Sequence, residues 1–252
     1  MKYAILASGS SGNASLVWTE RHCLVVEAGI PMRRMLELKR AAGCILKPDA
    51  ILVSHDHDDH AGFAAEASRY WHCPILCSRE CYDAAGFEKP YDVRVFAVGQ
   101  AFFMPEWDFH VRTISVPHAQ GAVGFCIATE GKDLAIFTDL GSITDEIRQA
   151  CANCHLIALE ANYSVAMMAE NPEYNEKLKK RLMAGYGHLS NDDCEAFLAS
   201  QEWPNLHTVA LIHGSRSNQL PILALTAARR GLKRDDIRVE CGWENLPLTL
   251  EV

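Results

Sequence analysis

The sequence predicts a four-layer αββα sandwich, a fold of mixed α/β (α+β) class in which two stacked sheets carry helices on both outer faces. Alternating strand and helix patterns in the first and last thirds, with a run of strand patterns over 92–138 between them, favour this arrangement. Hydrophobic residues make up 49% of the 252 residues, enough for a sizeable core. Because no repeat, low-complexity segment or Pro/Gly-rich linker divides the chain, residues 1–252 are predicted to form a single domain.

In the first third of the chain, short apolar runs predict strands over 2–7, 14–18, 22–27, 50–54 and 74–77. A helix is expected to begin at Pro31, because proline suits the first turn of a helix, and to end near Gly43. Two further helices are predicted over 60–70 and 79–85.

The middle of the chain has the pattern of a β-meander, with strands over 92–98, 107–116, 122–129 and 133–139 and a turn at Glu130-Gly131-Lys132. A helix is predicted over 142–152. The last third alternates again, with strands over 155–160, 207–212, 237–241 and 247–251, and helices over 173–184, 191–201 and 219–230.

The overall charge argues against a protein covered in positive potential. A net charge of -8 and a pI near 5.8 are not typical of proteins that bind nucleic acid without sequence preference. Basic residues nevertheless gather late in the chain, where each cluster is either a local binding patch or a solvated helix face. These residues are Lys177, Lys179, Lys180 and Arg181, and then Arg216, Arg229, Arg230, Lys233 and Arg234.

The cellular setting is expected to be the cytoplasm. No apolar stretch approaches the roughly 18 residues that a membrane span needs, and the first residues lack the pattern of a signal peptide. The ten cysteines are scattered in apolar contexts, which favours reduced, buried thiols over a disulfide framework. Cys151, Cys154 and His155 match the spacing of a haem attachment site, but the surrounding helix and strand patterns favour a structural role.

The segment VSHDHDDH, residues 53–60, places three histidines and three aspartates directly after the apolar run 50–53. On a helix His55 and His57 would diverge by about 200°, whereas in an extended segment they project to the same side. Imidazole with carboxylate suits zinc, manganese or iron better than calcium. The alternative is a solvated acidic loop, but three histidines within six residues favour a metal site.

Other strand ends supply further ligand-type residues. His118, Asp139 and His213 each follow an apolar run, and all three lie at one sheet edge if their strands run in compatible directions. Any one of them alone is compatible with a capping or surface residue, but together they complete two metal sites. The first ion is assigned to His55, His57 and His118, the second to Asp59, His60 and His213, and Asp139 is assigned as the bridge between them.

Substrate contacts are predicted on two segments. Gly9-Ser10-Ser11-Gly12-Asn13 offers backbone N–H groups to a phosphate, although a plain hairpin turn explains it equally well. His188 is a candidate phosphate ligand or leaving-group acid, the alternative being a loop histidine before a helix capped by Ser190. The predicted substrate-binding residues are therefore Ser10, Ser11, Asn13, His188, Ser190 and Ser215.

The motifs SHDHDDH, PH, TDLG and IH, in this order, resemble those of the metallo-β-lactamase-fold hydrolases. Within that superfamily, ILASGSSGNASLV near the start, LEAN at 159–162 and GHLSN at 187–191 resemble the YycJ/WalJ subfamily. The resemblance implies a cytoplasmic, metal-dependent phosphodiesterase that acts as a 5′ to 3′ exonuclease on DNA ends. Two divalent ions, zinc by ligand type or manganese by the resemblance, would hold a bridging hydroxide, and Asp59 and His188 would be the catalytic side chains.

The chain departs from the subfamily pattern without losing a metal ligand. The differing positions, which bear on ligand orientation and substrate contacts, are Glu27, Ala119, Tyr163, Ser164 and Gly214. Two other functions stay open from the residues alone. One is a small-molecule phosphodiesterase or an ester, thioester or lactone hydrolase, and the other is a non-catalytic metal or nucleic-acid binding module. The sequence points to no particular protein partner.

Overall fold

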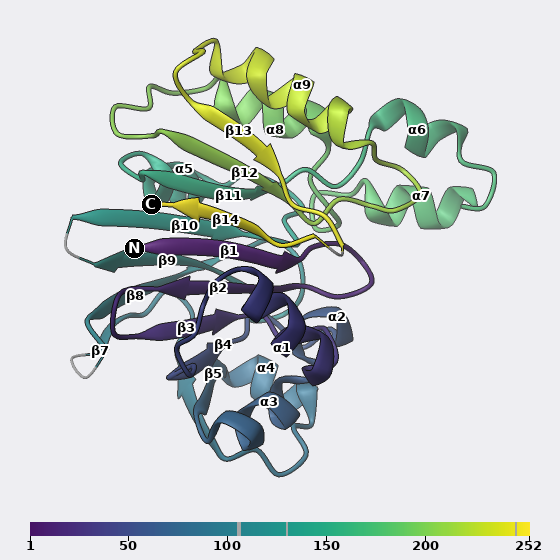
Figure 1. Ribbon diagram of the computed structural model, residues 1–252. Coiled ribbons are helices and arrows are strands. Elements are labelled where there is room, and N and C mark those ends of the chain that lie inside the picture. Colours follow the sequence, from purple (N-terminus) through teal and green to yellow (C-terminus); the bar gives the residue numbers. More distant parts are fainter. Residues whose placement is uncertain (105–106, 130, 245) are drawn as a thin grey trace.

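The computed structural model describes residues 1–104, 107–129, 131–244 and 246–252. Two seven-stranded sheets stack face to face, and helices cover the outer face of each, so the predicted αββα sandwich is confirmed (Figure 1). That residues 1–252 form one domain remains a prediction.

The first sheet is built from the N-terminal part of the chain and its last strand. Its order is β14-β1-β2-β3-β4-β5-β6, in which β3 to β6 are parallel and the remaining pairs are antiparallel. The strands are β1 (Lys2–Ala7), β2 (Ala14–Trp18), β3 (Cys23–Val26), β4 (Ala50–Leu52), β5 (Pro74–Ser78), β6 (Asp92–Phe96) and β14 (Leu248–Glu251).

The second sheet has the order β13-β12-β11-β10-β9-β8-β7, antiparallel from β7 to β10 and parallel from β10 to β13. Its strands are β7 (Ala101–Met104), β8 (Phe109–Ser115), β9 (Val123–Thr129), β10 (Lys132–Phe137), β11 (Leu156–Glu160), β12 (Thr208–Ile212) and β13 (Arg238–Cys241).

The helices divide between the two faces by their place in the chain. The first group is α1 (Met32–Ala41), α2 (Asp58–Ala61), α3 (Ala64–Trp71) and α4 (Arg79–Ala85). The second is α5 (Asp145–Cys151), α6 (Val165–Glu170), α7 (Glu176–Leu182), α8 (Asn191–Leu198) and α9 (Pro221–Leu232). Of these, α6 and α7 extend beyond the side of the sandwich rather than covering a sheet (Figure 1).

Three apolar cores hold the layers together. Tyr3 and Phe125 belong to the core between the two sheets, which alternating strand residues supply from both inner faces. Met35 of α1 packs in the core outside the first sheet, and Phe197 of α8 in the core outside the second. All ten cysteines are free and eight of them are buried, as expected for reduced structural thiols.

Two expectations about the elements are wrong. The predicted meander over 92–138 is not one sheet, because β6 pairs in parallel with β5 in the first sheet, and the meander begins only at β7. The predicted helix over 60–70 is two helices, α2 and α3, which Gly62 and Phe63 separate. The sequence patterns also miss β7 and α6. The predicted turn at 130–132 includes Glu130, which lies outside the described residues.

Across the described ranges, no helix combines the length and apolar character that a membrane crossing requires.

Candidate metal centre

The predicted ligands lie in loops that meet at one edge of the sandwich. Strands β8 and β10 run in the same direction, because both are antiparallel to β9, and β11 and β12 are parallel to β10. The carboxyl ends of all four strands therefore lie at one edge, where His118, Asp139 and His213 follow their strands. The loop from His55 to His60 follows β4 of the facing sheet. Topology thus brings residues far apart in the sequence to one place.

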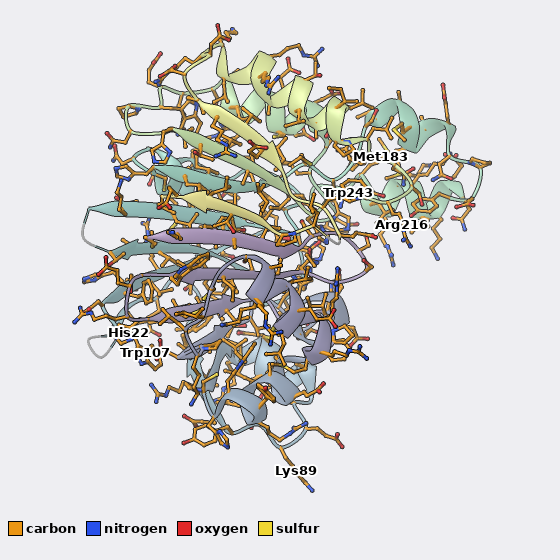
Figure 2. All side chains as sticks on the ribbon, viewed as in Figure 1. His22, Lys89, Trp107, Met183, Arg216 and Trp243 are labelled. Atoms are coloured by element: carbon orange, nitrogen blue, oxygen red, sulfur yellow. The ribbon has the colours of Figure 1, made fainter. Side chains whose placement is uncertain are left out.

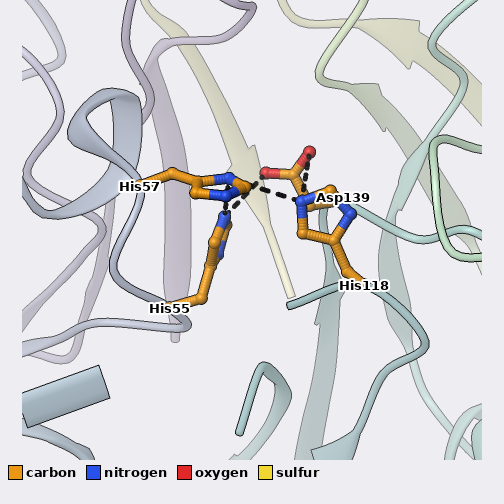
Figure 3. A group of neighbouring side chains, drawn as sticks. All are labelled: His55, His57, His118 and Asp139. Atoms are coloured by element: carbon orange, nitrogen blue, oxygen red, sulfur yellow. Dashed lines mark hydrogen bonds and ion pairs between the residues drawn. The ribbon is translucent and has the colours of Figure 1, made fainter. Parts of the chain in front are cut away.

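The first group of side chains is His55, His57, His118 and Asp139, whose ligand atoms all lie within 4.8 Å of one another (Figure 3). Nδ1 of His57 is 2.9 Å from Nε2 of His55 and 3.4 Å from Nε2 of His118. Oδ2 of Asp139 lies 3.4 Å from Nε2 of His55. Three imidazole nitrogens and a carboxylate thus converge as the sequence analysis expects for the first ion.

Contacts outside this group orient two of the rings. Nδ1 of His118 donates to the backbone carbonyl of Gly187 at 2.9 Å, which leaves Nε2 as the lone-pair nitrogen facing the group. Nδ1 of His55 lies 2.9 Å from the Ser54 hydroxyl, so its Nε2 likewise faces inward. Such outer hydrogen bonds fix the tautomer that a metal ligand needs.

The second group is Asp59, His60, Asp139 and His213, again with all ligand atoms within 4.8 Å. Oδ2 of Asp59 is 3.5 Å from Nε2 of His60 and 3.5 Å from Nε2 of His213. Oδ2 of Asp139 approaches Nε2 of His60 to 2.6 Å. Because Asp139 belongs to both groups, it occupies the position predicted for the bridging ligand.

The residues fit a pair of divalent cations. Among the described residues, Nε2 of His213 is buried without a hydrogen-bond partner, which folded proteins rarely tolerate. The nitrogens of His55 and His57 face each other at 2.9 Å, and together with His118 they direct lone pairs toward one point. A cation satisfies these atoms together, and imidazole with carboxylate is a donor set for divalent metals.

A third group overlaps the second and contains Asp139, Glu160, His188 and His213. Oε1 of Glu160 accepts from Nδ1 of His213 at 2.7 Å and from Nδ1 of His188 at 2.9 Å. Oε2 of Glu160 accepts backbone N–H groups from Leu140 and Leu189. The fully buried Glu160 therefore fixes the orientation of His213 and His188 together.

The same carboxylates perturb the titration of the imidazoles. Burial alone would lower the pKa of His188, but Glu160 and Asp139 raise it to about 10. For His213, burial again acts downward, and carboxylates including Asp139 and Glu160 raise the pKa to about 9. Burial would raise the pKa of Asp139, yet His213 and His60 hold it well below its usual range. Without metal, His213 holds a proton that a cation bound at its Nε2 would displace.

Three residues of the site adopt backbone angles that side chains disfavour. Glu27, Asp139 and His213 have φ values of 65°, 47° and 56°. Each directly or closely follows its strand, so the chain turns sharply there and directs the side chain across the sheet edge. Non-glycine residues in this region carry a conformational cost and cluster at functional sites.

The glycine-rich turn lies beside the metal centre, but its residues differ in exposure. Ser10 lines the cleft and Ser11 is exposed, so both remain available for substrate. Asn13 is buried, and its side chain accepts from the Gly9 N–H and donates to the Asp59 carbonyl at 3.3 Å. This geometry favours a role for Asn13 in holding Asp59 in place rather than in contacting substrate.

Two predicted substrate residues lie away from the cleft lining. Ser190 is buried and caps α8, where its hydroxyl accepts from the Asp193 N–H and donates to the Asp193 carboxylate at 2.6 Å. Ser215 is also buried and accepts from the Asn218 N–H. His188, in contrast, lines the cleft together with the metal-site residues.

The departures from the subfamily pattern fall around the site without removing it. Glu27 still supplies a carboxylate, with Oε2 3.5 Å from Nδ1 of His60. Ala119 lines the cleft, and Ser164 caps α6 by accepting from the Met167 N–H. Tyr163 and Gly214 are neighbours of site residues in the chain, and Tyr163 forms a backbone bridge with Ser190.

The sequence patterns missed the role of Glu160 and the presence of Tyr186 in the cleft lining, whereas Arg181, which also lines the cleft, belongs to a basic cluster already noted as a candidate binding patch. A signal existed for Glu160, because a charged residue that ends the apolar strand LIALE has the pattern used for Asp139 and His213. No comparable signal places Tyr186, whose position depends on how α7 packs beside the site.

The sandwich and the two histidine–aspartate groups at its edge define a metal-dependent hydrolase. The chain belongs to the metallo-beta-lactamase superfamily, whose family model matches residues 7–165. It is similar to a protein named exodeoxyribonuclease YycJ from Bacillus anthracis, with 26% identity over 97% of this chain and 94% of that protein. Exodeoxyribonuclease WalJ from Streptococcus pneumoniae is 27% identical over 94% of this chain and 90% of that protein. The resemblance stated from the motifs is thus confirmed.

Solved structures support the fold assignment. The metallo-beta-lactamase fold protein YhfI from Bacillus subtilis has a TM-score of 0.75 and 14% identity over 99% of both chains. Zn(2+)-bound PqqB from Methylobacterium extorquens has a TM-score of 0.77 and 14% identity over 100% of both chains. At this identity the likeness shows the fold alone.

Proposed function

We propose that the protein hydrolyses phosphodiester bonds at DNA ends, as a 5′ to 3′ exonuclease that depends on two divalent ions, zinc or manganese. The observation that carries the proposal is the pair of ligand groups sharing Asp139 at the base of a cleft of about 430 Å³. The two exodeoxyribonuclease relatives, which match nearly end to end, support DNA as the substrate.

In this proposal His55, His57 and His118 hold the first ion, Asp59, His60 and His213 hold the second, and Asp139 contacts both. Two bound divalent ions supply an activated water and stabilise charge on the attacking and leaving oxygens of the phosphate.

The chain's own residues orient the reactants. Asp59 lines the cleft, and its carboxylate is the one in the second group with appreciable exposure, at 27%. It is placed to accept a proton from a water at the phosphate. His188 holds its Nδ1 proton between Glu160 and Asp139, which leaves Nε2 to face the phosphate or the leaving oxygen.

The test is a substrate panel with the purified protein, stripped of metal and reloaded with zinc or manganese. The panel contains DNA labelled at the 5′ or 3′ end, bis(p-nitrophenyl) phosphate, a cyclic nucleotide, a thioester and a lactone. Metal-dependent release of 5′-end label as mononucleotides is expected. Faster turnover of the thioester or lactone than of DNA would reject the exonuclease proposal in favour of an ester hydrolase.

A matched pair of variants accompanies the panel. Asp59→Ala is expected to lower DNA hydrolysis by on the order of 100-fold or more, since it removes a ligand and the proton acceptor. Asp58→Ala, at the exposed neighbouring position outside the ligand groups, should keep its activity. No metal-dependent hydrolysis of any substrate would instead favour a binding module.

A further inference from the structure

One wall of the cleft is formed by the end of α7 and the segment that follows it. Arg181, Leu182 and Tyr186 line the cleft together with the metal-site residues His57 and Asp139. This wall lies on the side of the molecule where α6 and α7 extend, and Figure 2 labels Met183, directly after α7, on that side. The proposed metal chemistry uses none of these wall residues.

Tyr186 is an exposed aromatic residue on a firmly held backbone. Its side chain is 63% exposed, and within the described parts of the chain it has no hydrogen bond or ring contact. Its Cα lies so close to Gly141 that a Cβ added at Gly141 would meet it at 2.3 Å. The His188 N–H donates to the Leu182 carbonyl at 2.9 Å, closing the segment against α7. The loop thus presents the ring to solvent beside the cleft.

Basic side chains follow one face of α7. Lys177, Lys180 and Arg181 stand at helical spacings of three and four, so they form one stripe, and all three are exposed. Among the described residues, none of the three has an ion pair. Lys179 lies off the stripe, where it pairs with Glu176 and donates to the Ala169 carbonyl. A protein with a net charge of -8 therefore keeps an unneutralised positive stripe leading to its cleft.

We propose that this wall is a binding site for single-stranded DNA, in which an unpaired base stacks on Tyr186 and backbone phosphates contact the stripe of Lys177, Lys180 and Arg181. The inference rests on the proposed nuclease function and specifies the form of DNA that enters. Aromatic side chains stack on any unpaired base and cationic side chains follow the phosphates in sites that lack sequence preference. A cleft of about 430 Å³ falls in the size range of sites for small ligands, which suits a single nucleotide at a strand end.

The test measures binding rather than hydrolysis. Fluorescence anisotropy is recorded with the full-length, metal-loaded protein and a labelled oligothymidylate whose phosphorothioate linkages resist cleavage. Tyr186→Ala is expected to weaken binding roughly 5- to 150-fold, the range for loss of one stacked base. Tyr186→Phe, which keeps the ring face, should bind within about twofold of the unsubstituted protein. The matched control is Tyr70→Ala on α3, where the tyrosine is 57% exposed and is not among the residues that line the cleft.

Salt dependence tests the stripe separately. The variant Lys177→Gln/Lys180→Gln/Arg181→Gln should reduce the slope of log affinity against log salt by about 2, since each phosphate contact to a single strand contributes about 0.7. Arg229→Gln/Lys233→Gln, with charges removed on and after α9, should leave the slope unchanged. Unaltered melting curves would show that each variant is folded.

The outcomes separate this inference from the nuclease proposal. Equal binding of oligothymidylate by Tyr186→Ala and the unsubstituted protein would overturn it, as would tighter binding of a blunt duplex than of the single strand. Tyrosine-dependent binding of the single strand by a protein that hydrolyses no DNA would support the binding site while rejecting the nuclease proposal.

Discussion

Glu160 connects two histidines that come from distant parts of the chain. Its Oε1 accepts from both His188 and His213, and its Oε2 accepts two backbone N–H groups, so every contact requires an acceptor. A buried carboxylate in this position does more than neutralise charge, because it fixes which imidazole nitrogen faces the second ligand group. Glu160 is therefore a positioning residue, and its substitution should weaken metal binding.

The variant Glu160→Gln tests this role. An amide carries only one acceptor oxygen, so in either orientation its NH2 group faces N–H donors. We expect metal affinity or activity to fall by about 10- to 100-fold, measured by metal content after dialysis against buffered metal. Glu20→Gln on an exposed turn is the control. Unchanged metal content and activity would show that Glu160 does not orient the metal ligands.

His118 tests the division of ligands between two ions. Its ring belongs only to the first group, so His118→Ala should release one ion while the group of Asp59, His60 and His213 keeps the other. Mass spectrometric metal analysis at equilibrium should then show a stoichiometry near one instead of two. His207→Ala, outside the ligand groups, should keep both ions. Loss of both ions from His118→Ala would contradict independent sites.

The metal-ligand residues could be predicted from the sequence, but the side chains that hold them in position could not. The spacing of His55 and His57 and the apolar runs before Asp139 and His213 carry the signal, because burying such a side chain is costly unless it has a partner. Asn13 is an example of a side chain whose position the sequence pattern does not determine. Its turn pattern is compatible with substrate contact, but the turn folds inward and places the amide against Asp59.

Among the elements, short loops with close backbone approaches position the ligands. Gly29 follows β3, and a Cβ there would lie 1.7 Å from the Asp59 carbonyl oxygen. The Asn13 N–H donates to the same carbonyl at 2.8 Å. The loops after β1, β3 and β4 therefore pack backbone to backbone, and this contact sets the position of α2 with Asp59 and His60.

Gly29→Ala is expected to separate these loops. The added methyl group overlaps backbone that cannot move without shifting Asp59, so we expect a loss of about 1–3 kcal/mol in unfolding free energy together with weaker metal binding. Chemical denaturation and metal content measure the two effects. Gly185→Ala is the control, since its nearest atom would be the Ser142 hydroxyl at 3.9 Å. Full stability and metal content in Gly29→Ala would contradict the tight packing.

Most strands and helices could be predicted because apolar periodicity and capping residues act locally. The exceptions depend on partners that the local pattern does not contain. Strand β6 has the same alternating pattern as a meander strand, yet it pairs with β5, and only the topology decides this. The helix pattern over 60–70 breaks at Gly62 and Phe63, where the backbone of Phe63 leaves the helical conformation, and the spacing of apolar residues does not show this break.

The metal centre joins the two sheets of the sandwich. The first sheet contributes the loop from His55 to His60, and the second contributes His118, Asp139 and His213. Cations bound here would link the halves of the sandwich in addition to the apolar core between them. Their binding energy then adds to the stability of the fold, because the unfolded chain lacks the assembled site.

This linkage predicts a stabilisation by metal that grows with pH. In the metal-free protein the pKa of His213 is about 9, raised above the unfolded value of roughly 6.5. Its ion pairs with Asp139 and Glu160 stabilise the fold fully below about pH 6.5, and this contribution is lost as pH rises through about 9. A cation at Nε2 of His213 takes the place of the proton there, so the loaded protein does not lose stability in the same way.

The difference in melting temperature between loaded and metal-stripped protein should therefore increase from pH 6 to pH 9. At saturating metal it should reach on the order of 10 °C, from about 4 kcal/mol at a thousandfold excess over Kd and about 2–4 °C per kcal/mol for a chain of this size. Differential scanning fluorimetry across this range, with His207→Gln as a control outside the site, measures it. A difference that stays flat or shrinks with pH would mean that the cations do not replace the proton on His213. In that case metal binding and the charge network around Asp139 would be separate features of the fold.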